Sequence, residues 1–356
     1  MSYKILSSIL RGRWLVQKEY ADSQLPLIIA LRKGDSATVT SLIASDSRID
    51  RNQKGNVKPR KYSFKADTTN DEISDTDTTT EDDNTDPNAE PVGNNVYEVS
   101  PYTNLKLIPK GSIAYLDIDG VLMKQGNWCS WGMEDWSELF YGLQYADNID
   151  AVILDIDSPG GQCDGTATLA DAIVSCKTKK PVIAFVDDGL AASAAYWVIS
   201  ACTEIYCSQP TDAVGSIGVY CTLADYHAYY QHEGLPIRDI YAPQSVDKNQ
   251  DVIQALDNKD DLLKSELEFL ATTFIDTVNK NRKGKVNGKD WEGGKMYFAD
   301  AAIKQGLIDG IKGFDEVVKR TNSLIPVKEK ISTSPQNSNT MAFEKIMALL
   351  AYLPLQ

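Results

Sequence analysis

Two segments of the sequence carry residue types that acyl-transfer chemistry requires. The first, DSPGG at residues 157–161, directly follows an apolar stretch that ends at Ile156. Two glycines where a strand gives way to a helix expose consecutive backbone N–H groups, and these donors suit a developing oxyanion. A tight turn without chemistry is the competing interpretation. The position at the carboxyl end of a predicted parallel strand makes a functional site as reasonable as a plain turn.

The second segment, LAASAAYW at residues 190–197, holds one hydroxyl, that of Ser193, among small residues. Small neighbours let a substrate backbone approach the hydroxyl closely, and the start of a helix favours charge on its oxygen. A serine packed inside an alanine-rich helix is the alternative, and the segment taken alone favours it.

A serine nucleophile needs a base. The chain has two histidines, His227 and His232, which lie close together on a predicted surface helix. That position suits a Ser-His-Asp triad poorly. A lysine is therefore the expected base, because burial can hold a lysine amine neutral near physiological pH.

Four ordered blocks of the sequence resemble a known family. They are VILDIDSPGG (152–161), PVIAFVDDGLAASAAYW (181–197), AVGSIGV (213–219) and a closing block from GKMYF (294–298) to GLID (306–309). Over about residues 98–320 they resemble successive segments of the signal peptide peptidase A family of serine peptidases, which includes bacteriophage prohead (capsid maturation) proteases. The resemblance implies an α/β fold of the crotonase/Clp-like type and a Ser–Lys dyad.

Carried onto this sequence, the resemblance makes Ser193 the nucleophile and assigns the backbone N–H of Gly160 or Gly161 to the oxyanion hole. Ser216, in GSIGV, matches a serine that hydrogen-bonds the catalytic lysine in the family. Lys248 is the only lysine in the window where the family's single-domain members carry that base. The resemblance implies no metal and no organic cofactor.

The sequence departs from the family pattern at two points. Ala194 and Ala195 follow the nucleophile, where the family often has glycine. The residues before Lys248 lack the usual glycine and basic neighbours, and an ungapped match puts Val246 at the lysine position. Lys259, or a loss of activity, is the alternative to Lys248 as the base.

Apolar stretches alternate with helical patterns through the middle of the chain. Strands are predicted at 112–120, 151–156, 181–186, 205–207 and 217–219, and helices at 135–145, 166–176, 191–201 and 260–280. This alternation implies crossover connections and a largely parallel sheet with helices on both faces. The predicted regions are an N-terminal helical segment (1–50), a disordered acidic linker (51–97), the peptidase domain (98–325), and a polar linker with a C-terminal amphipathic segment that could begin a scaffold-like extension (326–356).

Charge and hydropathy argue against several classes of protein. The net charge of −14 argues against a nucleic-acid partner, because a phosphate backbone needs clustered lysine and arginine. Residues 67–90 hold ten acidic side chains and no lysine or arginine, which predicts the disordered linker. No apolar run approaches the ~20 residues that cross a bilayer, and the N-terminus lacks a secretory pattern. We therefore expect a protein of the host-cell cytoplasm or the prohead interior, without a membrane segment.

These observations together predict a serine endopeptidase, best matched to a phage prohead protease that cleaves capsid or scaffold proteins during capsid maturation. A homo-oligomer is expected, because the fold that the resemblance implies usually buries its sites between subunits. Three alternatives stay open: a host-type signal peptide peptidase that degrades cleaved signal peptides, a catalytically silent capsid-assembly scaffold, and a crotonase-type acyl-CoA enzyme.

Overall fold

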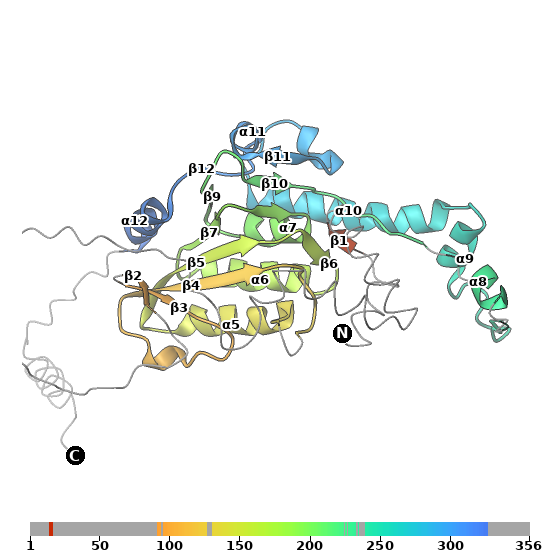
Figure 1. The fold of residues 1–356 in the computed structure, drawn as a ribbon, viewed down its shortest axis with the longest axis horizontal. Helices are drawn as coiled ribbons and strands as arrows, with labels where there is room; N and C mark the ends of the chain where they lie inside the picture. Colours follow the sequence, from red (N-terminus) through yellow and green to blue (C-terminus); the bar gives the residue numbers. More distant parts are fainter. Residues whose placement is uncertain are drawn as a thin grey trace, which may run out of the picture. The chain divides into compact units, whose positions relative to one another are not determined.

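The structure, a computed structural model, describes residues 14–16 and 91–326, apart from residues 94, 127–129, 224, 226, 233 and 235–238. A seven-stranded sheet forms the centre of this part of the chain (Figure 1). Its order is β12 (Gly310–Ile311), β9 (Glu204–Cys207), β7 (Val182–Val186), β5 (Ile149–Asp157), β4 (Ser112–Asp119), β3 (Val96–Glu98) and β2 (Pro91–Gly93). All neighbours pair parallel except β2 and β3.

Helices cover both faces of this sheet. On one face lie α5 (Met133–Tyr145), α6 (Thr166–Lys177) and α7 (Ala194–Ser200), whose buried side chains join those of the strands in the larger core. On the other face lies α12 (Phe314–Leu324), where Phe314 packs against Tyr115 and Phe185. The central strand β5 is buried along almost its whole length, in keeping with its apolar run AVIL at residues 151–154. The expected α/β class, a largely parallel sheet flanked by helices, is confirmed.

Two small sheets lie beside the carboxyl ends of the central strands. One joins β8 (Leu190–Ala192), β10 (Ala213–Gly215) and β11 (Met296–Phe298), with β10 in the middle. The other joins β6 (Gly160–Gln162) to β1 (Trp14–Val16) in an antiparallel pair. The two segments with predicted chemistry, residues 157–161 and 190–197, therefore each contribute to one of these small sheets.

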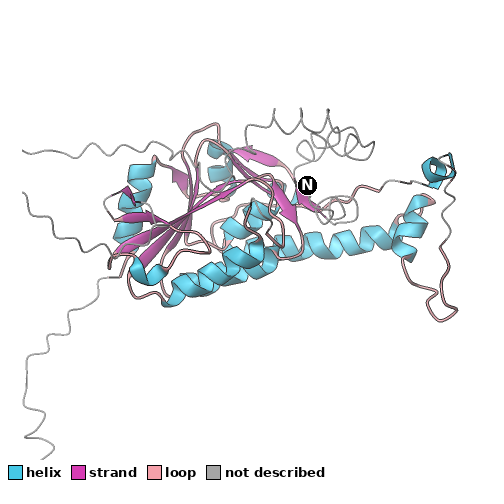
Figure 2. Ribbon diagram, turned by 60° about the horizontal axis from the view of Figure 1, so that its bottom comes forward, coloured by secondary structure: helices cyan, strands magenta, loops and turns pink. Residues whose placement is uncertain are grey.

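The long helix α10 (Asp261–Asn281) is anchored at its C-terminal half. Phe274 and Val278 are fully buried, and the Phe274 ring stacks on Trp197 of α7 at 4.6 Å between centroids. The N-terminal half of α10 extends past the sheets to α9 (Gln250–Leu256), and α8 (His227–His232) lies near the same end (Figure 2). We call α8, α9 and this half of α10 the outer arm. No helix in the described part of the chain is long and apolar enough to cross a membrane.

The predicted regions compare with the structure as follows. Within the predicted helical segment 1–50, the described residues are Trp14–Val16, and they form a strand instead of a helix. In the predicted linker 51–97, the described residues from Pro91 onward include β2 and the start of β3, so the sheet begins earlier than residue 98. The rest of both segments, and nearly all of 326–356, lies outside the described residues.

Candidate active site

Ser193 occupies a sharp turn between β8 and α7. Its backbone has φ 55° and ψ −117°, a conformation that costs a non-glycine residue free energy and is held here by its surroundings. The Ser193 N–H donates to the Gly215 carbonyl oxygen at 2.8 Å, and its carbonyl accepts from the Trp197 N–H at 3.0 Å. The Ser193 Oγ lies 3.5 Å from the carbonyl oxygen of Gly218. A strand-to-helix turn of this kind presents a nucleophile at the carboxyl edge of a parallel sheet.

The DSPGG turn is fixed to the strand that precedes Ser193. Ser158, fully buried, forms a parallel bridge with Ala191: its N–H donates to the Leu190 carbonyl at 2.7 Å, and its carbonyl accepts from Ala192 at 3.0 Å. Its hydroxyl donates to the Gly120 carbonyl at 2.5 Å and accepts from the Gly160 N–H at 3.2 Å. The turn that carries the two glycines is thereby held next to the Ser193 turn.

Ser216 follows β10 just as Ser193 follows β8. The parallel register pairs Gly215 with Ala192, so the two serines are the next residues of adjacent strands. Ser216 also has a positive φ, 53°, and its N–H donates to the Lys295 carbonyl at 2.9 Å. Of the predicted site residues, the structure thus brings together Ser193, Ser216 and the glycine turn.

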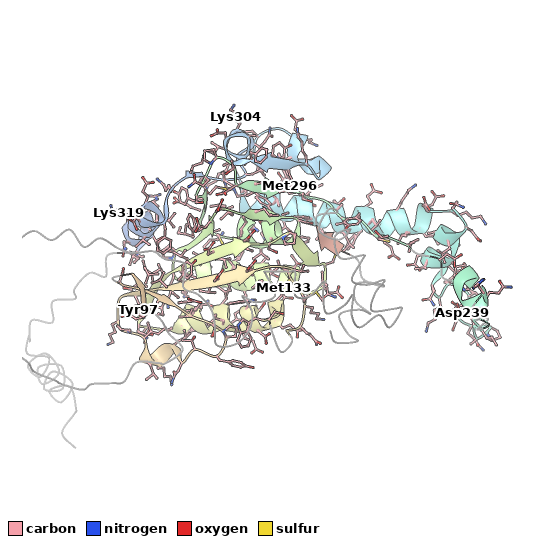
Figure 3. All side chains as sticks on the ribbon, in the orientation of Figure 1. Tyr97, Met133, Asp239, Met296, Lys304 and Lys319 are labelled. Atoms are coloured by element: carbon pink, nitrogen blue, oxygen red, sulfur yellow. The ribbon has the colours of Figure 1, made fainter. Side chains whose placement is uncertain are left out.

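Lys248 is not brought to this cluster within one copy of the chain. It is exposed, in the turn just before α9, and its N–H donates to the Ser245 carbonyl at 3.2 Å. The turn directly precedes α9 of the outer arm, whereas α7, which begins right after Ser193, contacts the other half of α10 (Figure 1). Figure 3 labels Asp239, near α8 on the arm, and Met296 of β11, beside the site strands. The alternative base, Lys259, is also on the arm, just before α10.

Three features of the site escaped sequence reasoning. The Ala194 N–H is at the first position of α7, where no intrahelical acceptor exists, so it is a second candidate oxyanion donor beside the glycine turn. Strand β11 supplies the Lys295 carbonyl that holds Ser216. Gly215 has φ +126°, and a Cβ there would meet that same carbonyl oxygen at 2.5 Å. The signal for Gly215 was present in the GSIGV block; the other two depend on backbone geometry.

A buried carboxylate positions the turn that leads into β8. Asp212 accepts from the N–H groups of Ser208 and Gln209, both at 2.8 Å, and of Gly189 at 3.1 Å. Burial raises the pKa of Asp212, against the lowering effect of these hydrogen bonds. Asp157 accepts from the Leu190 N–H at 3.1 Å on the other side. The two carboxylates thus hold the backbone of the loop between β7 and β8 from two sides.

The fold and the site define a class: an α/β domain with a strained serine at a strand-to-helix turn and backbone N–H groups of a glycine turn beside it. Residues 175–328 match the model of Peptidase family S49. Over these residues the chain is similar to peptidase family S49, in agreement with the family expected from the sequence blocks.

Several curated proteins are similar to this chain. The head-tail preconnector protein GP5 of Enterobacteria phage P21 is 27% identical over 67% of this chain and 49% of its own length. The capsid assembly protease C of Escherichia phage lambda is 25% identical over 65% of this chain and 53% of its own length. Protease 4 of Haemophilus influenzae is 25% identical over 50% of this chain and 29% of its own length. The chain thus spans about half the length of the phage relatives that it matches.

Among solved structures, one that matches is the 1510-N membrane protease specific for a stomatin homolog from Pyrococcus horikoshii. It is 19% identical, with a TM-score of 0.29, over 58% of this chain and 78% of that chain. Another is an enoyl-CoA hydratase/isomerase family protein from Silicibacter pomeroyi, 15% identical with a TM-score of 0.33, over 54% of this chain and 71% of that chain.

Proposed function

We propose that this chain is a serine endopeptidase in which Ser193 is the nucleophile. The observation that carries the proposal is the positive-φ turn at Ser193, locked by Gly215 and flanked by the glycine turn that Ser158 anchors. A strained strand-to-helix turn, held by backbone hydrogen bonds and placed beside backbone N–H donors, is what a presented nucleophile needs.

The oxyanion donors are the N–H groups of Gly160 and Ala194. Ala194 has no intrahelical acceptor, and the bond from Gly160 to the Ser158 hydroxyl is long, at 3.2 Å. A charged oxygen is a stronger acceptor than a hydroxyl, so it displaces Ser158 as the partner of Gly160. Each such donor contributes about 3 kcal/mol to lowering the barrier.

Lys248 acts as the base on the Ser193 of a second copy of the chain. Its exposure on the outer arm, away from its own Ser193, supports this arrangement. The exposed apolar side chains of Ile240, Val246 and Phe269 near it support an interface there, because burying them would stabilise an assembly. Ser216, next to Ser193, then orients the incoming amine. The proposal therefore includes a homo-oligomer whose active sites are shared between neighbours.

The reaction is acyl transfer. Neutral Lys248 accepts the Ser193 proton as Oγ attacks the peptide carbonyl carbon, and the two N–H donors hold the oxyanion. The C–N bond then breaks, and the lysine gives its proton to the leaving amine. A water, deprotonated by the same lysine, cleaves the acyl-enzyme ester and restores Ser193.

A role in phage capsid maturation is the biological setting that we propose. It is supported by the similarity to a capsid assembly protease and to a head-tail preconnector protein, both from phages. Capsid or scaffold proteins are then the substrates. Degradation of signal peptides is the second candidate, supported by the 25% identity, over 57% of this chain, to a putative signal peptide peptidase SppA of Enterococcus faecium. A silent scaffold and an acyl-CoA enzyme are less favoured, since neither needs a strained serine beside Gly160.

Labelling with a fluorophosphonate tests the nucleophile. We expect the wild-type chain to be labelled and Ser193→Ala to lose the label, with Ser216→Ala still labelled at a reduced rate. A wild-type chain that is not labelled in any assembly state contradicts the peptidase and supports the scaffold.

Mixing two inactive variants tests the shared site. Ser193→Ala and Lys248→Ala are each expected to be inactive on unfolded casein, whereas a mixture regains part of the activity because one copy supplies each residue. Lys259→Ala is the matched control and stays active. A Lys248→Ala variant that stays active, or an inactive Lys259→Ala variant whose activity returns on mixing with Ser193→Ala, would move the base to another lysine.

A further inference from the structure

The edge of the glycine turn that faces away from Leu122 is occupied by a distant part of the same chain. Strand β1 pairs antiparallel with β6, with Trp14 opposite Gln162, Leu15 opposite Gly161 and Val16 opposite Gly160. This pairing connects residues near the start of the sequence to the turn beside Ser193.

The backbone of β6 shows which of its groups point at β1. Leu122 donates to the Gly160 carbonyl at 2.9 Å and accepts from the Gln162 N–H at 2.9 Å. Peptide groups of successive residues in a strand point to opposite edges, so the N–H and C=O of Gly161 point away from Leu122 and toward β1. Leu15, directly opposite Gly161, is therefore the residue of β1 that exchanges hydrogen bonds with it.

A peptide substrate needs the same edge. An extended segment that delivers a carbonyl to Ser193 can add as a strand to β6, where the Gly161 peptide groups offer one donor and one acceptor. The β1 strand runs in the direction that such a segment requires. It is antiparallel to β6, so its C-terminal residue, Val16, is opposite Gly160 and thus at the end nearest the nucleophile.

We propose that β1 is a built-in occupant of the peptide-binding edge, an autoinhibitory strand that a substrate must displace. This rests on the proposed peptidase function of Ser193. The strand is three residues long and pairs only with β6 among the described strands, so few hydrogen bonds hold it. Such a contact is weak enough to be exchanged for a substrate segment of the same direction.

Two proline variants of the full chain separate this role from a structural one. Leu15→Pro removes the N–H that faces Gly161, whereas Val16→Pro removes an N–H that points away from β6 and serves as the matched control. We expect Leu15→Pro to cleave unfolded casein about tenfold faster than wild type, as expected from losing one or two backbone hydrogen bonds. Val16→Pro stays near the wild-type rate. A synthetic peptide of residues 11–20, RGRWLVQKEY, returns the rate of Leu15→Pro toward the wild-type value.

Hydrogen exchange distinguishes failure of this inference from failure of the proposed function. The Gly161 amide is expected to exchange faster in Leu15→Pro than in wild type or Val16→Pro, and this holds whether or not the chain cleaves peptides. Faster exchange without casein cleavage in any variant removes the peptidase function and, with it, the inhibitory role. Unchanged exchange and unchanged cleavage in Leu15→Pro overturn the inference, as does cleavage that falls while the chain stays folded.

Discussion

The Ser193 N–H donates to the carbonyl oxygen of Gly215 at 2.8 Å. This hydrogen bond joins the turn at Ser193 to the turn after β10, which carries Ser216. It continues the parallel register in which Gly215 pairs with Ala192. The conformation of the serine is therefore set by a strand more than twenty residues later in the sequence, and not by the alanine-rich segment around it. A substitution that displaces β10 should therefore change the backbone conformation of Ser193.

Gly215→Ala is expected to reduce activity strongly and to destabilise the domain by about 1–3 kcal/mol. Gly215 has φ +126°, and an added Cβ would meet the Lys295 carbonyl oxygen at 2.5 Å, so β10 and β11 must separate. Urea unfolding and the fluorophosphonate labelling rate measure the two effects. Gly293→Ala is the control, because no atom lies within 4 Å of its Cβ position. Equal labelling of the two variants would contradict the coupling of β10 to Ser193.

Ser158→Ala tests the anchoring of the glycine turn. The variant loses the hydroxyl bonds to the Gly120 carbonyl and from the Gly160 N–H, which costs about 1 kcal/mol of stability. Because the turn loses its bond to the Gly120 carbonyl and can shift, we expect kcat to fall at least tenfold, in keeping with misplacement of one oxyanion donor. Ser175→Ala loses a comparable hydrogen bond, to Gln144, away from the site. Similar kcat values for the two variants would exclude a positioning role for Ser158.

Sequence patterns predicted the strands of the central sheet more accurately than the elements next to the candidate site. The strands at 112–120, 151–156 and 181–186 correspond to β4, β5 and β7, because long apolar runs in a parallel sheet carry a strong local signal. The helix predicted at 191–201 begins at Ala194 instead. Alanine favours helix, but pairing of β8 with β10 keeps Leu190–Ala192 extended and leaves Ser193 at the turn.

The candidate site also contains parts that sequence blocks predicted and parts that the pairing of strands decides. Ser193, Ser216 and the glycine turn were assigned from ordered sequence blocks, and the structure groups them because each block ends a strand of neighbouring sheets. Strand 217–219 was predicted, whereas β10 is Ala213–Gly215, since the backbone bonds to β8 and β11 decide the pairing. Lys248 stays a prediction. No local pattern specifies which copy of the chain supplies it.

The stability of the domain is expected to fall in acid through Asp309. Burial raises the pKa of this carboxyl, but the hydrogen bond and charge of Arg282, together with Lys285, outweigh burial and hold the pKa below its usual range. A lowered folded-state pKa stabilises the fold above the unfolded value of about 3.9, and this contribution is lost as the pH falls through the folded value.

Urea unfolding between pH 7 and pH 3 measures this contribution. Asp309→Asn should be less stable than wild type at pH 7 and lose less stability on acidification. Asp260→Asn, which removes an exposed ion pair with Lys264, is the control and should follow the wild-type curve. Parallel curves for wild type and Asp309→Asn would contradict the assignment.

Proteolytic activity is expected to rise toward alkaline pH if a lysine is the base of Ser193. The base must be neutral to take the serine proton, and an ordinary lysine has a pKa of about 10.4, so its neutral fraction grows about tenfold per pH unit below that value. A histidine base would instead give a plateau above about pH 7. We therefore expect kcat/KM for a peptide substrate to increase steadily from pH 6 to pH 9, with the slope lost in Lys248→Ala together with activity. A flat profile over that range counts against a lysine of ordinary pKa as the base, since neither the turn at Ser193 nor the oxyanion donors titrate there.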